Sequence, residues 1–216
     1  MKGYVGTLMN IPESVKMAER CVESGKQFGV DVEIVPAVWK DVAMAELAKE
    51  SLTLQQYDKS YSNVGAVVGN FVAQYRMWIT VMQSEEPGII LEHDAVFTDN
   101  VPNLEGQGDI INIGKPSYGN FNSQTAPGVY PMFSKPGGYI PGAHGYYLTP
   151  KGAEELVMAA ENRGAAPVDM FLNKTLFPNI KEIFPWVVEA RDEFTTIQNV
   201  KGCLAKHNYD KDFKVL

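Results

Sequence analysis

The stretch Ile89-Ile90-Leu91-Glu92-His93-Asp94-Ala95 is a short apolar run that ends abruptly in two acids and a histidine. A continuous apolar run of this length is typical of a strand that is buried on both faces, as in a parallel sheet. Open α/β sheets bind ligands outside the carboxyl ends of their strands. Glu92, His93 and Asp94 are therefore predicted to lie at a ligand-binding edge, where carboxylate oxygens suit a hard divalent cation that can neutralise a diphosphate. On spacing alone, a strand end that turns into solvent explains the pattern equally well.

Apolar strands and helical segments alternate on both sides of this run, which predicts an α/β fold with a mostly parallel central sheet flanked by helices. The strongest helix signal covers Val64 to Met82, where apolar residues recur at spacings of three and four. The other expected elements are strands over 4–8, 32–38, 109–113, 145–148 and 186–188, helices over 12–25, 42–50, 150–163 and 167–176, and a turn over 57–63. Since no repeat or linker interrupts the chain, residues 1–216 are predicted to form a single domain.

The 216 residues carry 19 Lys and Arg against 26 Asp and Glu, a formal net charge of −7. This sign argues against nucleic acid as a partner, because binding to a phosphate backbone depends on basic residues. Seven acids and no Lys or Arg occur from Glu85 to Asp109. The negative potential is therefore expected to centre on the edge that carries Glu92 and Asp94.

Cys21 and Cys203 match neither a zinc-ligand pair nor a redox motif, so reduced thiols and a cytoplasmic location are expected. The apolar run at the start of the sequence is too short for a signal peptide. The most membrane-like stretch, 64–82, contains Asn70, Gln74 and Arg76. No integral membrane segment is therefore expected.

Two further segments contain candidate site residues. His144 stands among small residues directly before a strand, where its imidazole is open enough to reach a ligand or a metal. A lone histidine near a strand is nevertheless more often structural. Asp169 falls in the first turn of an expected helix, where the helix dipole stabilises a carboxylate without any catalytic duty.

The order of these segments resembles the family 25 glycosyltransferases, the group of lipooligosaccharide and procollagen galactosyltransferases. The matching stretches cover nearly the whole chain and are 65–78, 90–94, 142–150, 167–169 and 190–197. The resemblance implies a GT-A type fold with a Rossmann-like sheet and a role in the biosynthesis of a lipopolysaccharide or a similar glycan. It also implies a donor such as UDP-galactose or UDP-glucose, a saccharide or hydroxylated acceptor, and a divalent metal, commonly Mn²⁺, with Mg²⁺ as the alternative.

Carried over by this resemblance, Glu92, His93, Asp94 and His144 would contact the donor, with Asp94 and His144 as metal ligands. Asp169 would be the general base of an inverting hexosyl transfer, taking the proton of the acceptor hydroxyl. Asp109, at the start of a strand, is the competing candidate for that base.

The chain differs from the usual family residues at Ala66, Asn70 and His93. These differences motivate a second hypothesis, a non-catalytic module of the same fold that binds a nucleotide sugar or a glycan. A third reading is a metal-dependent phosphohydrolase that uses the same acids.

The 28 residues from Gly114 to Pro141 contain five glycines, five prolines and five aromatic residues. A long loop of this composition is usually functional or mobile. Its aromatic residues are interpreted either as a sugar-facing platform or lid, or as a small satellite core under the loop; they are Tyr118, Phe121, Tyr130, Phe133 and Tyr139. Trp78 lies on the apolar stripe of its helix and is expected to pack in the core.

Overall fold

The computed structural model describes residues 1–56, 63–117, 120–135, 137–191, 194–197 and 214–215. Four sequence-based expectations fall partly or wholly outside these residues. They concern the turn over 57–63, of which only Asn63 is described, the loop residue Tyr118, the family-like stretch 190–197 at Asp192 and Glu193, and the thiol of Cys203.

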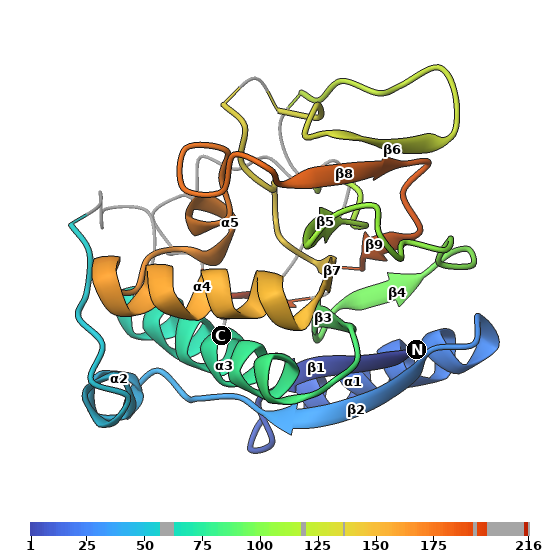
Figure 1. The fold of residues 1–216 in the computed structure, drawn as a ribbon. Coiled ribbons are helices and arrows are strands. Elements are labelled where there is room, and N and C mark those ends of the chain that lie inside the picture. Colours follow the sequence, from blue (N-terminus) through green and yellow to red (C-terminus); the bar gives the residue numbers. More distant parts are fainter. Residues whose placement is uncertain (57–62, 118–119, 136, 192–193, 198–213, 216) are drawn as a thin grey trace.

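A seven-stranded sheet with the order β2-β1-β3-β7-β5-β8-β6 forms the centre of the domain (Figure 1). Five strands run in one direction, and β7 and β6 run in the other. In sheet order the strands are β2 (Asp31–Pro36), β1 (Lys2–Thr7), β3 (Gly88–Glu92), β7 (Gly145–Leu148), β5 (Ile110–Asn112), β8 (Lys181–Phe184) and β6 (Gly128–Pro131). The predicted α/β fold with a mostly parallel central sheet is confirmed.

Helices cover both faces of this sheet. They are α1 (Pro12–Gln27), α2 (Ala43–Lys49), α3 (Val64–Gln83), α4 (Pro150–Arg163) and α5 (Val168–Phe171). One core cluster packs under α3 and α4, which lie side by side in Figure 1, and a second packs under α1. Ile90 belongs to the first cluster, and its neighbours Ile89 and Leu91 belong to the second. The run around β3 is apolar throughout because both of its faces are buried.

Two short strand pairs complete the described part of the chain. β4 (Ala95–Phe97) directly follows the turn that contains His93 and Asp94, and it pairs antiparallel with β9 (Val188–Ala190). β10 (Phe194–Thr195) pairs in parallel with β11 (Lys214–Val215). The strand expected over 186–188 is wrong at Trp186 and Val187, which lie between β8 and β9; only Val188 belongs to a strand, β9.

The helix expected over 167–176 is wrong beyond Phe171. The amide of Asn173 donates to the carbonyl oxygens of Met170 and Phe171, and its side-chain oxygen accepts from the backbone N–H groups of Thr175 and Leu176. An asparagine that bonds to nearby backbone in this way competes with the helical hydrogen bonds. The helix consequently ends after one turn.

The long loop over 114–141 contains an unpredicted strand, β6, which pairs with a second unpredicted strand, β8. β6 is an edge strand, so Pro131 costs it no ladder hydrogen bond to a further strand. The sequence did not predict β8 because Glu182 interrupts the apolar pattern of this strand. That carboxylate is nevertheless fully buried in the sheet.

Trp78 packs in the core as expected. Its side chain is fully buried and stacks on Phe171 with ring centroids 5.7 Å apart. Among the described residues, no helix combines the length and the apolar character needed to cross a bilayer.

Candidate functional site

Glu92, Asp94 and His144 come together at the carboxyl end of β3. Glu92 is the last residue of β3, Asp94 lies in the turn that leads to β4, and His144 directly precedes β7. Because Leu91 pairs with Gly145 across the two antiparallel strands, the residues beyond this pair face each other. One ligand atom from each side chain lies within 4.8 Å of the others, and His144 Nδ1 is 3.3 Å from Glu92 Oε2.

His144 is the most diagnostic member of this triad because it is buried without being satisfied. His144 is only 5% exposed, and neither nitrogen of its ring makes a hydrogen bond within the described part of the chain. The contact of Nδ1 with Glu92 is close but lacks hydrogen-bond geometry. Buried polar atoms of this kind cost free energy unless something binds them. Two carboxylates and an imidazole form a donor set that fits a divalent cation.

The backbone before His144 packs directly against the imidazole. Gly142 has φ +92°, a conformation that side chains with a Cβ rarely adopt. A Cβ at this position would lie 2.1 Å from His144 Nε2 and 2.7 Å from Ser117 Oγ. Glycine is therefore required here, both for the backbone turn and for the close approach of the backbone to the ring.

Asn70 holds Glu92 from the side of α3, where its amide nitrogen donates to Glu92 Oε1 at 3.1 Å. Two glycines let this helix approach the segment after β2. A Cβ at Gly69 would lie 2.3 Å from the carbonyl oxygen of Val38, and one at Gly65 would lie 2.6 Å from that of Lys40. The close approach of the two backbones fixes the start of α3 at the same edge of the sheet as Glu92.

A buried hydrogen-bonded layer lies next to the triad. The Tyr146 hydroxyl donates to Gln74 Oε1 at 2.6 Å and accepts from Trp78 Nε1 at 2.5 Å. Burial, and to a smaller extent the charge of Glu92, raises the pKa of Tyr146, so this phenol stays neutral. The layer supports α3 against β7 and supplies no further charge to the site.

The other two predicted site residues, His93 and Asp169, are not part of the triad. His93 is partly buried in the turn between Glu92 and Asp94. Asp169 is partly buried on α5, whose Phe171 packs edge-on against Phe71, the neighbour of Asn70. Asp169 therefore lies on a helix that packs against α3, and its carboxylate is not part of the cluster of three ligand groups.

Asp109 lies at the opposite edge of the sheet. The following residue, Ile110, pairs with Leu148, which in turn pairs with Gly88 at the start of β3. The Asp109 carboxylate accepts hydrogen bonds from Lys151 Nζ at 2.6 Å and from Thr149 Oγ1 at 2.8 Å. The bond from Lys151, followed by that from Thr149, lowers the pKa of Asp109 despite its partial desolvation. Asp109 ties the start of α4 to the sheet and is too far from the triad to compete as its base.

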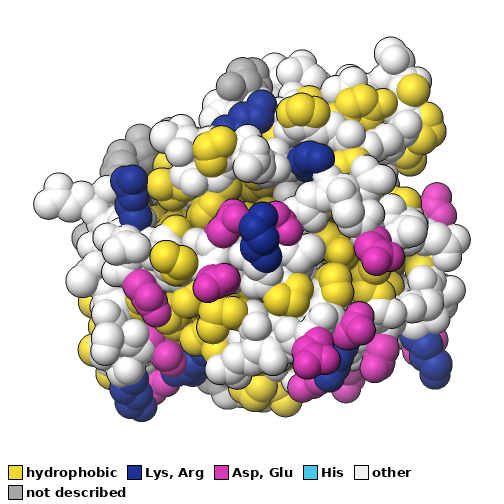
Figure 2. Space-filling view, viewed as in Figure 1, with side chains coloured by type: hydrophobic (Ala, Val, Ile, Leu, Met, Phe, Trp, Pro, Cys, Tyr) yellow, Lys and Arg dark blue, Asp and Glu magenta, His cyan; other side chains and the backbone are white. Residues whose placement is uncertain are grey.

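The predicted concentration of negative charge around Glu92 and Asp94 is wrong. Glu85 and Glu86 immediately precede β3, so they lie with Asp109 at the amino edge. On the face shown in Figure 2, acidic side chains are dispersed over the surface. Glu85 and Glu86 are close to Glu92 and Asp94 in the sequence but not in space, because the length of β3 separates the two pairs.

Sequence reasoning did not identify Asn70 or Glu182 as supporting residues. Asn70 stands four residues before Gln74, and two amides one helical turn apart on an otherwise apolar stripe are a signal of a buried polar contact. Glu182 gave no such signal, because an acid within an apolar run is ordinarily read as an exposed residue.

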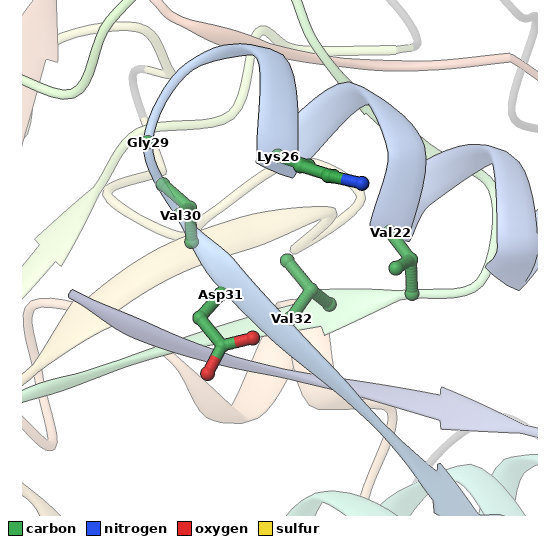
Figure 3. Close-up of a pocket in the computed structure, with 6 residues that line it drawn as sticks. All are labelled: Val22, Lys26, Gly29, Val30, Asp31 and Val32. Atoms are coloured by element: carbon green, nitrogen blue, oxygen red, sulfur yellow. The ribbon is translucent and has the colours of Figure 1, made fainter.

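A shallow pocket of about 330 Å³ is separate from the triad. Figure 3 shows that Val22 and Lys26 of α1 and residues 29–32 around the start of β2 line it. β2 starts beside Lys2 of β1, so the pocket lies at the amino edge of the sheet, opposite Glu92. Its lining includes no member of the triad.

No family model and no curated protein matches this chain. Among solved structures, the chain is similar to the galactosyltransferase LgtC in complex with donor and acceptor sugar analogs. The two share 10% sequence identity over 88% of this chain and 86% of that one, with a TM-score of 0.47. A similarity at this level does not assign an activity.

Proposed function

We propose that this chain is a metal-dependent glycosyltransferase of the GT-A type, resembling family 25, that moves a hexose from a nucleotide-diphosphate sugar to a saccharide or hydroxylated acceptor. The observation that carries the proposal is the buried, unsatisfied imidazole of His144 beside Glu92 and Asp94 at the carboxyl edge of the sheet. Ligands of open α/β sheets bind at this edge.

Asp94 and His144 would hold the divalent cation, Mn²⁺ or Mg²⁺, with Glu92 and His93 contacting the ribose or the diphosphate of a UDP-hexose. A bound cation would neutralise the charge that develops on the leaving diphosphate. Asn70 orients Glu92 through its hydrogen bond, and Gly142 allows the backbone to pass directly beside the imidazole.

In the proposed inverting transfer, Asp169 accepts the proton of the acceptor hydroxyl. The bond from the acceptor oxygen to the anomeric carbon forms while the bond from that carbon to the diphosphate oxygen breaks. The electron pair of the broken bond leaves with the diphosphate. The packing of α5 against α3, the helix that carries Asn70, supports this role, and the position of Asp109 at the other edge leaves Asp169 as the preferred base.

Calorimetric titration with UDP, with and without Mn²⁺, tests the proposal. We expect the wild-type protein to bind UDP more tightly in the presence of Mn²⁺. Asp94→Asn should weaken this Mn²⁺-dependent binding by about tenfold or more, whereas Asp99→Asn, which alters an exposed acid of the same segment, should leave it unchanged. The proposal fails if neither UDP nor another common nucleoside diphosphate binds under either condition.

Donor turnover separates the proposed enzyme from a module that only binds. Asp169→Asn should retain UDP binding and lose hydrolysis and transfer over a panel of UDP-hexoses. Binding without turnover by the wild-type protein would favour a non-catalytic module, and phosphate release from simple esters would favour a phosphohydrolase.

A further inference from the structure

Five aromatic side chains form a partly exposed cluster at the end of β8. Trp186 stacks on Phe133 with ring centroids 5.8 Å apart and an interplanar angle of 29°. Phe121 and Phe184 each meet the Trp186 ring edge-on at 5.4 Å, and Tyr130 meets Phe133 at 5.9 Å. All five are partly exposed. This aromatic cluster is therefore neither a closed satellite core nor a set of independent surface residues.

The cluster is held rigidly from beneath by Glu182. One carboxylate oxygen accepts from Trp186 Nε1 at 2.9 Å and from Asn112 Nδ2 at 2.7 Å. The other accepts from the backbone N–H groups of Phe133 at 3.2 Å and Ser134 at 2.9 Å. A buried carboxylate with four neutral N–H donors orders the indole and the loop backbone at the same time. The two stacked rings are consequently presented in one fixed arrangement.

The cluster lies at the same edge of the sheet as the triad. Leu91 pairs with Gly145, and one residue further along β7 Tyr146 pairs with Asn112, which pairs with Glu182. β8 is two strands from β7. At about 4.8 Å between neighbouring strands, the end of β8 is about 10 Å from the position of His144 across the sheet. A short oligosaccharide spans this distance.

The chemistry of the segment around the cluster suits a neutral, hydroxyl-rich ligand. No Asp or Glu occurs from Ile110 to Ala153, and the lysines of this range, Lys115, Lys135 and Lys151, each donate to an oxygen of the protein, at Glu189, Asn120 and Asp109. Amide and hydroxyl side chains instead follow Phe121 directly, at positions 122–125. Figure 2 shows hydrophobic side chains gathered at the upper right, over β6 and the loop that leads into it. Flat aromatic faces bordered by neutral hydrogen-bonding groups match a pyranose, which has an apolar C–H face and polar edges.

We propose that the aromatic cluster is the acceptor-binding surface and that it binds a neutral saccharide by stacking a pyranose ring on the exposed part of Trp186, with Phe121, whose ring is almost perpendicular to the indole, contacting the edge of the sugar. This assignment rests on the proposed glycosyltransferase function. It places the acceptor about two strands away from the triad, with its reacting hydroxyl directed toward the donor sugar that the triad would hold.

The test uses an immobilised array of neutral oligosaccharides containing galactose, glucose and N-acetylhexosamines, probed with the full chain with and without UDP and Mn²⁺. We expect the wild-type protein to bind at least one member of the array. Phe121→Ala and Trp186→Ala should weaken this binding by about tenfold or more, the loss typical of an anchoring aromatic side chain. Trp186→Phe keeps a stacking ring and should retain most of the binding.

Phe28→Ala is the matched control, because Phe28 is also partly buried but follows α1 at the other edge of the sheet. Phe121 has no hydrogen bond to Glu182, so Phe121→Ala remains informative if Trp186→Ala misfolds. Circular dichroism identifies such misfolding. The assignment is overturned if the wild-type protein binds no array member in either condition, or if Phe121→Ala binds as strongly as the wild type and Phe28→Ala.

Titration of the same variants with UDP and Mn²⁺ separates this proposal from the one it rests on. If neither UDP nor another common nucleoside diphosphate binds but Phe121→Ala loses saccharide binding, the transferase proposal fails and the saccharide surface stands. If UDP binding is intact in every variant and saccharide binding never depends on Phe121, the acceptor assignment alone fails.

Discussion

Replacement of Glu182 by glutamine is the sharpest test of how the carboxyl edge of the sheet is held together. Each carboxylate oxygen accepts two N–H groups, and glutamine offers only one oxygen. In one orientation, the new NH₂ group faces the donors of Asn112 and Trp186. In the other, it faces the backbone N–H groups of Phe133 and Ser134. Two donors lose their acceptor in either case.

The expected cost follows from the burial of those donors. In the pair of Asn112 and Trp186, the hydrogen bond of Asn112 is buried and that of Trp186 is partly buried. In the pair of Phe133 and Ser134, the hydrogen bond of Ser134 is buried and that of Phe133 is partly buried. Each partly buried donor can turn to water. A buried donor without a partner costs about 1–3 kcal/mol, and hydrogen bonds to a charged acceptor are stronger than neutral ones. We therefore expect Glu182→Gln to lower the free energy of unfolding by about 2–4 kcal/mol.

Urea denaturation followed by circular dichroism measures this difference. Glu154→Gln, which changes an exposed acid on α4, is the control and should stay within about 0.5 kcal/mol of the wild type. If Glu182→Gln is as stable as this control, the four hydrogen bonds do not stabilise the native state and the argument for a rigid aromatic cluster is refuted.

Two further predictions concern titratable groups away from that network. The folded-state pKa of Asp109 is depressed, so its stabilising effect is present above the unfolded-state pKa and is lost as the pH falls through the folded value. Asp109→Asn should therefore cost about 0.5–1 kcal/mol at pH 7, since its partner Lys151 is exposed, and nothing near pH 2; equal unfolding curves at pH 7 would contradict this. Burial, and to a smaller extent the Asp94 charge, raises the pKa of the Cys21 thiol to about 12. In a Cys203→Ser variant, Cys21 should not react with a thiol reagent at pH 8 until urea unfolds the chain, and rapid labelling of the native protein would disprove this.

The sequence by itself determined those helices and strands whose pattern of apolar residues is set by their own backbone geometry and not by contacts with residues far away in the chain. The spacing of apolar residues over 64–82 specified α3, and the apolar run of β3 specified a strand buried on both faces. The abrupt change to Glu92 and Asp94 then marked the carboxyl edge of the sheet. These features are readable because side-chain periodicity follows directly from backbone geometry.

Tertiary structure decided which polar residues meet at that edge. Asp109 is 17 positions from Glu92 in the sequence and lies at the other edge, whereas His144, 52 positions away, is 3.3 Å from it. Glu182 is buried in the sheet because donors from three other segments converge on it, one of them 70 residues distant along the chain. No local pattern encodes such convergence, because the burial of a charge is favourable only once all of its partners are in place.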